Sequence, residues 1–204
     1  MNPLKSISGT IIAGIVLAVI IVLATQGNHM VAGMKAQSII IWLHVLAGIT
    51  WIGLLYYFNF VQVPALGEAA SDSDGPGPAA ISRYVAPRAL SWFRWGALVT
   101  WITGATFLLH KGQLVNAVLL GLNSDPINQY ALTIGVGAWL GTIMLFNVWV
   151  LIWPNQKKVL GMVEASADEI AKAKNTAFLA SRSNTLMSIP MVMSMVGAGH
   201  GWFM

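Results

Sequence analysis

The stretch Ser38–Phe60, which reads SIIIWLHVLAGITWIGLLYYFNF, decides the fold class. Its 23 residues include no Asp, Glu, Lys or Arg. A helix needs roughly 20 mostly apolar residues to cross a bilayer. The stretch therefore predicts a transmembrane helix that carries one histidine, His44, within its length.

The rest of the chain has the same apolar character. Hydrophobic residues make up 56% of the 204 residues, charged residues only 9%, and the mean hydropathy is +0.70. In soluble domains about a quarter of the residues are charged. We predict an all-α integral membrane bundle of five transmembrane helices, which forms a single membrane domain over residues 1–204. The predicted spans are 8–25, 38–60, 90–110, 130–153 and 178–199.

The segments between the spans contain recognisable turn and capping signals. Residues 70–78 (ASDSDGPGP) are typical of a loop, and Pro87 suits the first turn of the third helix. Ser166 and Glu169 form an S-x-x-E capping-box pattern. This pattern predicts a cytoplasmic helical extension over about 167–177 that runs into the fifth span.

The distribution of basic residues predicts the orientation. If the N-terminus is cytoplasmic and the C-terminus outside, nine basic residues lie inside and two outside, which is a strong positive-inside bias. The inner residues are Lys5, Arg83, Arg88, Arg94, Lys157, Lys158, Lys172, Lys174 and Arg182, and the outer ones are Lys35 and Lys111. Lipid headgroups account for the net charge of +4, so we predict membrane lipid as a partner and no nucleic acid.

Cysteine is absent from the sequence. This excludes a disulfide, a thiolate metal site and a covalently attached c-type haem on this chain. Any haem must be held non-covalently.

The four histidines gather at the predicted outer face. His44 lies about 9 Å below the outer end of its span, at 1.5 Å per residue. His110 and His200 lie near the outer ends of the third and fifth spans, and His29 lies in the first outer loop. A histidine inside a span is expensive and usually marks a functional site. We expect His44 to be a ligand or proton-transfer group, with an interhelical hydrogen bond as the alternative.

Haem b suits this arrangement, because two imidazoles from different helices can bind the iron from both sides. We expect His44 and His200 to be the axial ligands, with His110 as the alternative second ligand. Gly48, one helical turn from His44, gives a flat macrocycle room to approach, and Trp51 follows on the same face.

Copper is the alternative cofactor. Met191, Met193 and Met195 precede His200, and thioethers together with imidazole can bind Cu(I). Core packing is the competing interpretation for methionines in a helix.

Other polar and small residues also lie within the spans. Arg94, Arg182, Asn147 and Asn184 could line a site for a quinone headgroup or a proton path, and interfacial snorkelling is the alternative for the two arginines. Three glycines of the fourth span are expected to permit close helix packing: Gly135, Gly137 and Gly141.

Several motifs occur in a characteristic order. They are His44–Gly53 (HVLAGITWIG), Trp92–Trp95 (WFRW) with Thr100, Trp101 and Gly104, Arg182–Pro190 (RSNTLMSIP), and Gly197–His200 (GAGH). Over about residues 39–200 the chain resembles the membrane domain of the cytochrome c-linked bacterial urate oxidases, the urate oxidase N-terminal domain family. The H-x6-W-x-G element is also similar to haem-binding membrane protoporphyrinogen oxidases and to copper-resistance membrane proteins.

The resemblance implies a multi-pass protein of the bacterial inner membrane, with His44 and His200 at the positions of family histidines. It also implies a partner such as cytochrome c or another redox subunit, within a larger membrane complex. The full family enzymes carry a cytochrome c domain, whereas this sequence holds no haem c motif. In addition, Trp95 follows Arg94 where the family has an acidic residue.

Three functional hypotheses remain open. The first is a haem b-binding electron-transfer subunit that works with a partner electron carrier. The second is a membrane oxidase of urate or another small reductant, which makes the chain a possible oxidoreductase component. The third is a cofactor-free accessory or assembly subunit of a larger respiratory or photosynthetic membrane complex.

Overall fold

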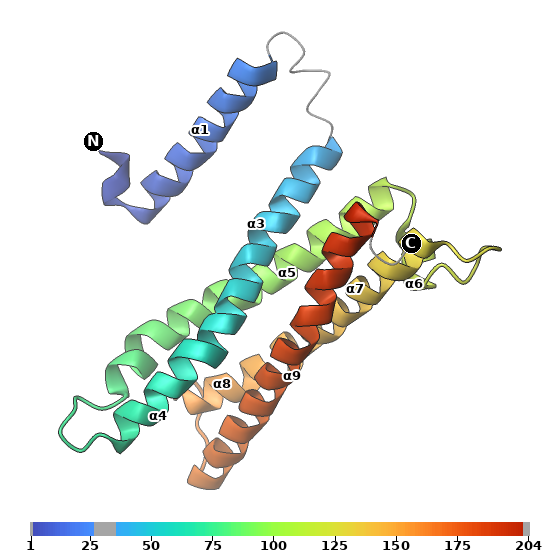
Figure 1. Cartoon of the computed structure of the whole chain (residues 1–204). Helices are drawn as coiled ribbons and strands as arrows, with labels where there is room; N and C mark the ends of the chain where they lie inside the picture. Colours follow the sequence, from blue (N-terminus) through green and yellow to red (C-terminus); the bar gives the residue numbers. More distant parts are fainter. Residues whose placement is uncertain (1, 27–35, 202–204) are drawn as a thin grey trace. The chain divides into compact units, whose positions relative to one another are not determined.

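The computed structural model describes residues 2–26 and 36–201, and its regular elements are helices throughout this part of the chain (Figure 1). The chain divides into two units, Met1–Ile39 and Ile40–Met204. The all-α prediction is confirmed for the described residues.

The first unit holds a short 3-10 turn, η1 (Pro3–Lys5), and α1 (Ile7–Gln26). The Asn2 side chain accepts a hydrogen bond from the Leu4 amide and caps the turn. α1 agrees with the predicted span over 8–25. Its sequence is apolar on all sides, as expected of a helix surrounded by lipid or by protein.

The second unit is built from four long helical segments. They are α3 (Ala36–Tyr56) continuing through η3 (Tyr57–Gln62) into α4 (Val63–Ser71); η4 (Ile81–Val85) with α5 (Ala86–His110); α7 (Gln129–Phe146) continuing through η5 (Asn147–Ile152) into α8 (Trp153–Val159); and α9 (Ala167–His200). A short helix, α6 (Leu114–Val118), lies between α5 and α7. The other four predicted spans each fall inside one of these segments, and the segment that holds the span predicted over 38–60 extends to Ser71.

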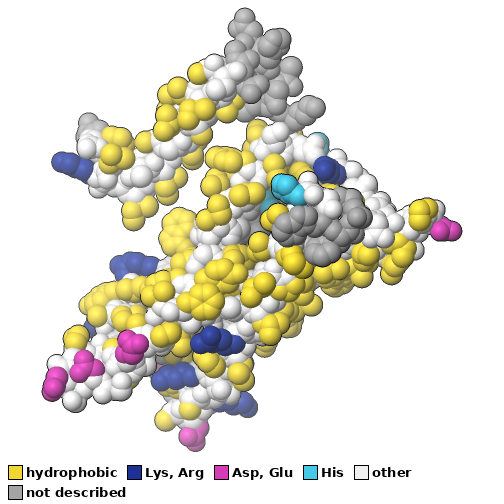
Figure 2. All heavy atoms as spheres, viewed as in Figure 1, with side chains coloured by type: hydrophobic (Ala, Val, Ile, Leu, Met, Phe, Trp, Pro, Cys, Tyr) yellow, Lys and Arg dark blue, Asp and Glu magenta, His cyan; other side chains and the backbone are white. Residues whose placement is uncertain are grey.

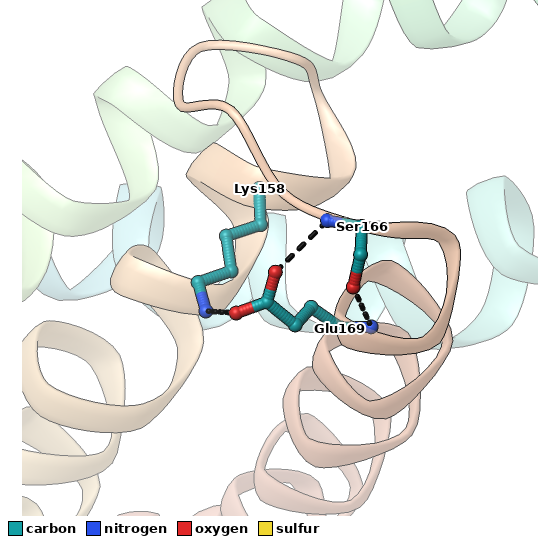
Figure 3. Close-up of polar contacts among 3 residues, drawn as sticks. All are labelled: Lys158, Ser166 and Glu169. Carbon is teal, nitrogen blue, oxygen red and sulfur yellow. Dashed lines mark hydrogen bonds and ion pairs between the residues drawn. The ribbon is translucent and has the colours of Figure 1, made fainter.

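Local signals set several helix ends. The Ser166 hydroxyl accepts from the Glu169 amide (3.3 Å), and the Glu169 carboxylate accepts from the Ser166 amide (2.8 Å), so the predicted capping box is present. Lys158 at the end of α8 lies 3.6 Å from the same carboxylate (Figure 3). Pro87 lies in the first turn of α5 as predicted. The helical extension over 167–177 is confirmed as part of α9.

Among the described residues, three helical segments are long and apolar enough to cross a membrane: 7–25, 36–71 and 129–159. α5 and α9 fall outside this group, so five spans stay a prediction. Both helices contain small or polar residues that face the bundle, such as Thr100, Asn184 and Ser188, which lower their apolar content while they are buried. Figure 2 shows hydrophobic side chains over much of the visible face of the second unit and carboxylates toward its ends.

The core of the second unit lies between α3, α5, α7 with η5, and α9. Trp51, Leu55, Phe93, Met144 and Val148 are nearly or completely buried there. Polar side chains join the helices inside this apolar core. The hydroxyls of Tyr56 and Ser188 lie 3.0 Å apart, Asn59 donates to Ser181 and Asn147 donates to Asn184, a use of polar groups that is common between membrane helices.

Two of the three glycines in α7 permit close packing as predicted. A Cβ at position 135 would clash with the Ala117 carbonyl oxygen of α6, and a Cβ at position 137 would lie 3.1 Å from the Ser194 Cβ of α9. Gly141 has nothing within 4 Å of such a Cβ, so the prediction is wrong for this residue. It borders a cavity instead.

Candidate functional site

The side chain of His44 is half-buried between α3 and α5. Its Nδ1 lies 2.8 Å from the backbone carbonyl oxygen of Thr100 and 3.4 Å from the Thr103 hydroxyl. A carbonyl oxygen can only accept, so Nδ1 carries the proton and donates it to Thr100. The lone pair of Nε2 is then free. Metal-binding histidines are typically oriented in this way, with the second ring nitrogen donating to a carbonyl or carboxylate.

A glycine on α5 makes the position of this ring possible. A Cβ at Gly104 would lie 2.8 Å from His44 Cε1 and 3.1 Å from its Nδ1. The backbones of α3 and α5 also approach closely at Gly96, where a Cβ would lie 3.4 Å from the Trp51 amide nitrogen. The two glycines let α3 and α5 lie close together, which places His44 within reach of the Thr100 carbonyl.

A cavity of about 120 Å³ adjoins His44. Its wall consists mostly of apolar residues, including Trp51, Leu108, Met191 and Met195. Trp51 is only 2% exposed, and its indole N–H has no hydrogen-bond partner within the described residues. Buried donors are nearly always paired, so an acceptor for this N–H in or beside the cavity is expected.

The other predicted histidines lie elsewhere. His200, at the end of α9, is exposed, and its Nδ1 lies 2.8 Å from the Val196 carbonyl of its own helix. His110 is exposed at the end of α5. Neither borders the His44 cavity. His29 and Lys35 lie outside the described residues.

The methionines of α9 separate into two groups. Met191 is buried and Met195 is half-buried, and both border the His44 cavity, whereas Met193 is 41% exposed. The methyl group of Met195 packs against Gly137, because a Cβ there would lie 3.2 Å from it. Two methionines of α9 thus line the same cavity as His44, which His200 does not border. Within residues 2–26 and 36–201, no group of three His, Asp or Glu side chains is placed to hold a metal.

The imidazole of His44 suits an axial ligand of haem b, but the cavity beside it does not hold the macrocycle. Pockets for cofactors and drug-sized ligands typically measure about 300 to 1,000 Å³. The space of about 120 Å³ accepts a single ion or a few water molecules. Gly48, which was expected to give the macrocycle room, does not border this cavity.

The predicted polar quartet is only partly brought together. Asn147 donates to Asn184 (2.8 Å), and Asn184 donates to the Met144 carbonyl (3.0 Å), so the two amides form a buried link between α9 and the α7–η5 segment. The Arg94 guanidinium lies 3.8 Å from the centre of the Trp153 ring, in a cation–π contact. Arg182 is exposed and lies over Phe178 of its own helix.

Comparison with protein families supports the predicted resemblance. The family model described as urate oxidase N-terminal matches residues 113–204. The resemblance to this family is confirmed. The match includes α6 to α9 with Met191, Met195 and His200, and it does not reach His44. Comparison with curated proteins and with solved structures gives no match.

Two features of the site were missed by reasoning from the sequence. Thr100 positions the His44 ring through its backbone carbonyl, and Gly104 makes room for the ring because it has no side chain. Neither role has a recognisable sequence signature. Asn59 and Gln62 are buried at the far end of the same helical segment. Two amides within an otherwise apolar run were the signal that could have identified them.

Proposed function

We propose that the chain is an integral membrane electron-transfer subunit whose redox centre is held at His44. One observation supports this most directly. The Nδ1 of His44 donates to the Thr100 carbonyl, which leaves Nε2 free as a ligand beside a cavity inside the bundle. A partner electron carrier, such as cytochrome c or another redox subunit, exchanges electrons with this centre.

Copper is the cofactor that the geometry favours. Thioethers are soft ligands that select Cu(I), and imidazole also binds copper. His44, Met191 and Met195 border a cavity of a size that suits one ion. The chemistry that copper supplies is one-electron transfer. Haem b, which the family resemblance implies, is the competing assignment, and the cavity volume counts against it.

The proposed topology has five spans, with the N-terminus cytoplasmic and the C-terminus outside. α1 and the 36–71 and 129–159 segments support it by length and composition. α5 and α9 complete it because they pack in the same bundle and their polar residues, such as Asn184, face its interior. With this orientation the His44 cavity lies toward the outer side of a bacterial inner membrane.

Metal and haem analysis of the purified chain tests the proposal. The chain is prepared in detergent with Cu(I) and a competing bicinchoninate chelator, and copper is measured by mass spectrometry beside a pyridine haemochrome spectrum. We expect about one copper per chain and no haem. His44→Ala should abolish binding, and Met195→Leu should weaken it by about tenfold, a factor that corresponds to about 1.4 kcal/mol.

Met193→Leu is the matched control, because Met193 lies on the same helix but is exposed and does not border the cavity. Its copper affinity should equal that of the wild type. If the purified chain contains one haem per chain and His44→Ala lacks it, haem b and not copper is the cofactor. A chain that binds neither group would support the accessory-subunit hypothesis instead.

The family match supports a second candidate, a membrane oxidase of urate or another small reductant. In this case urate should reduce the bound metal or an added cytochrome c, and the His44→Ala variant should not respond. Absence of urate-dependent reduction in the metal-loaded chain would exclude urate as the electron donor.

A further inference from the structure

A second and larger cavity lies at the other end of the bundle. It measures about 410 Å³, within the range typical of ligand pockets. Its walls come from the η3–α4 segment, η4 with α5, η5 with α8, and the first half of α9. It shares no residue with the His44 cavity.

The walls of this cavity are mainly apolar and partly aromatic. Phe58 and Phe93 meet edge to face with their ring centres 5.4 Å apart, and Leu90 and Phe178 also border the space. Aromatic side chains of this kind favour offset or edge contacts with a flat ring. Lys174, which is exposed, is the one charged residue that borders the cavity within the described part of the chain.

Two amides from consecutive turns of η3 supply polar groups to the cavity. The Asn59 side chain is 2% exposed and is fixed, because its Nδ2 donates to the Leu55 carbonyl (2.9 Å) and to the Ser181 hydroxyl (2.8 Å). Gln62 is 7% exposed, and its carbonyl oxygen Oε1 has no hydrogen-bond partner among the described residues. Buried polar groups in native proteins are nearly always paired, so this amide needs a partner.

The unpaired amide of Gln62 is suited to a ligand whose carbonyl becomes a hydroxyl on reduction. The terminal torsion of glutamine is broad, so a rotation presents either the amide oxygen or the NH₂ group. The oxygen accepts from a hydroxyl, and the NH₂ group donates to a carbonyl. One residue can therefore pair with both redox forms of a quinone.

We propose that this cavity binds the headgroup of a membrane-soluble quinone or quinol. The flat ring lies among Phe58, Phe93 and Phe178, and one of its oxygens pairs with Gln62. An anionic lipid fits less well, because the walls are mainly apolar and Lys174, which is exposed, is the one cation that borders the cavity among the described residues. Binding at this site does not depend on the proposed redox centre at His44.

Calorimetric titration of the full chain in lipid nanodiscs tests the proposal. The ligands are decyl-benzoquinone and its borohydride-reduced quinol, and empty nanodiscs give the partition background. We expect saturable binding of one molecule per chain in both redox states. Gln62→Leu should weaken both affinities by about tenfold, the effect of one hydrogen bond to a neutral group in a buried site.

Gln129→Leu is the matched control, since it makes the same chemical change at an exposed residue away from the cavity, and it should bind as the wild type does. Gly67→Leu gives an independent test in α4, because Gly67 borders the cavity and a Cβ there meets nothing within 4 Å. It should reduce binding by occupying the space while the bundle stays folded, as circular dichroism would verify.

Two results would overturn the proposal. One is equal binding by the wild type and Gln62→Leu. The other is displacement of the quinone by oleate together with loss of binding in Lys174→Gln, which would assign the cavity to a lipid anion. His44→Ala should bind quinone normally, so failure of the copper proposal and failure of this one are distinguishable.

Discussion

The two ends of the bundle use the same four helical segments for different chemistry. At one end, Gly104 and Thr100 position the imidazole of His44 beside a small cavity that two methionines of α9 also border. At the other end, phenylalanines and the amides of Asn59 and Gln62 surround a cavity more than three times as large. The comparison teaches that side-chain size where helices cross sets the volume of a site, and that the buried donor atoms set its ligand.

Gly104→Ala should give the largest contrast between the two ends. The new methyl group would lie 2.8 Å from His44 Cε1, so the ring must move away from the Thr100 carbonyl. Overpacking of this kind costs about 1 to 3 kcal/mol. We expect copper affinity to fall at least tenfold (about 1.4 kcal/mol) and quinone affinity to stay unchanged, both measured on one preparation.

Gly53→Ala is the control for this change. A Cβ at Gly53 in α3 meets nothing within 4 Å, so the substitution should leave both sites intact and slightly stabilise the helix. Unchanged copper binding in Gly104→Ala would show that the close approach of α5 does not position His44.

Asn184→Ala should lower the stability of the whole bundle and should not act on one of the two cavities alone. Asn184 is fully buried between the two cavities along α9, and its loss leaves the Asn147 amide without its partner. We expect a destabilisation of about 1 to 3 kcal/mol, the usual cost of an unsatisfied buried group. Thermal unfolding in detergent measures it.

The double variant Asn147→Leu/Asn184→Leu tests the cause. If the cost comes from the unpaired amide, replacing both partners should recover part of the lost stability. If the double variant is less stable than Asn184→Ala, the pair contributes through packing and not through its hydrogen bond.

Glu169→Gln should have the smallest effect and should be confined to the charged end. Hydrogen bonds from the Ser166 amide and hydroxyl, followed by the charge of Lys158, hold the pKa of the Glu169 carboxyl below its ordinary value. A lowered pKa stabilises the folded chain at a pH above the ordinary value, and this contribution is lost as the pH falls through the lowered value. Because the group is exposed, the gain is small.

The melting temperature as a function of pH checks this prediction. The difference between the wild type and Glu169→Gln should be present at neutral pH and should shrink in acid. Glu164→Gln, in the preceding loop, is the matched control without a capping role. A difference that does not change with pH would mean that the carboxylate charge does not contribute to the cap.

The fold was largely predictable because its signals are local. Apolar runs located the long helices of the described residues, although α5 and α9 are less apolar than the others, and Ser166 with Glu169 located the start of α9. Helix lengths were less predictable, since η3 and α4 continue the second span with residues such as Asn59, Gln62 and Glu68 that a search for apolar character excludes. The polar residues of α5 and α9 are buried among neighbouring helices, which no local pattern reveals.

The candidate site was predictable only in part. The sequence by itself determined that the chain is helical and apolar, that it lacks cysteine ligands and that His44 lies within an apolar run. Only the tertiary structure decided which groups meet His44, because helix crossings join residues that are distant along the chain. That packing brought Thr100 and Gly104 to the imidazole and two methionines of α9 to the cavity beside it, and it placed His200 at an exposed helix end.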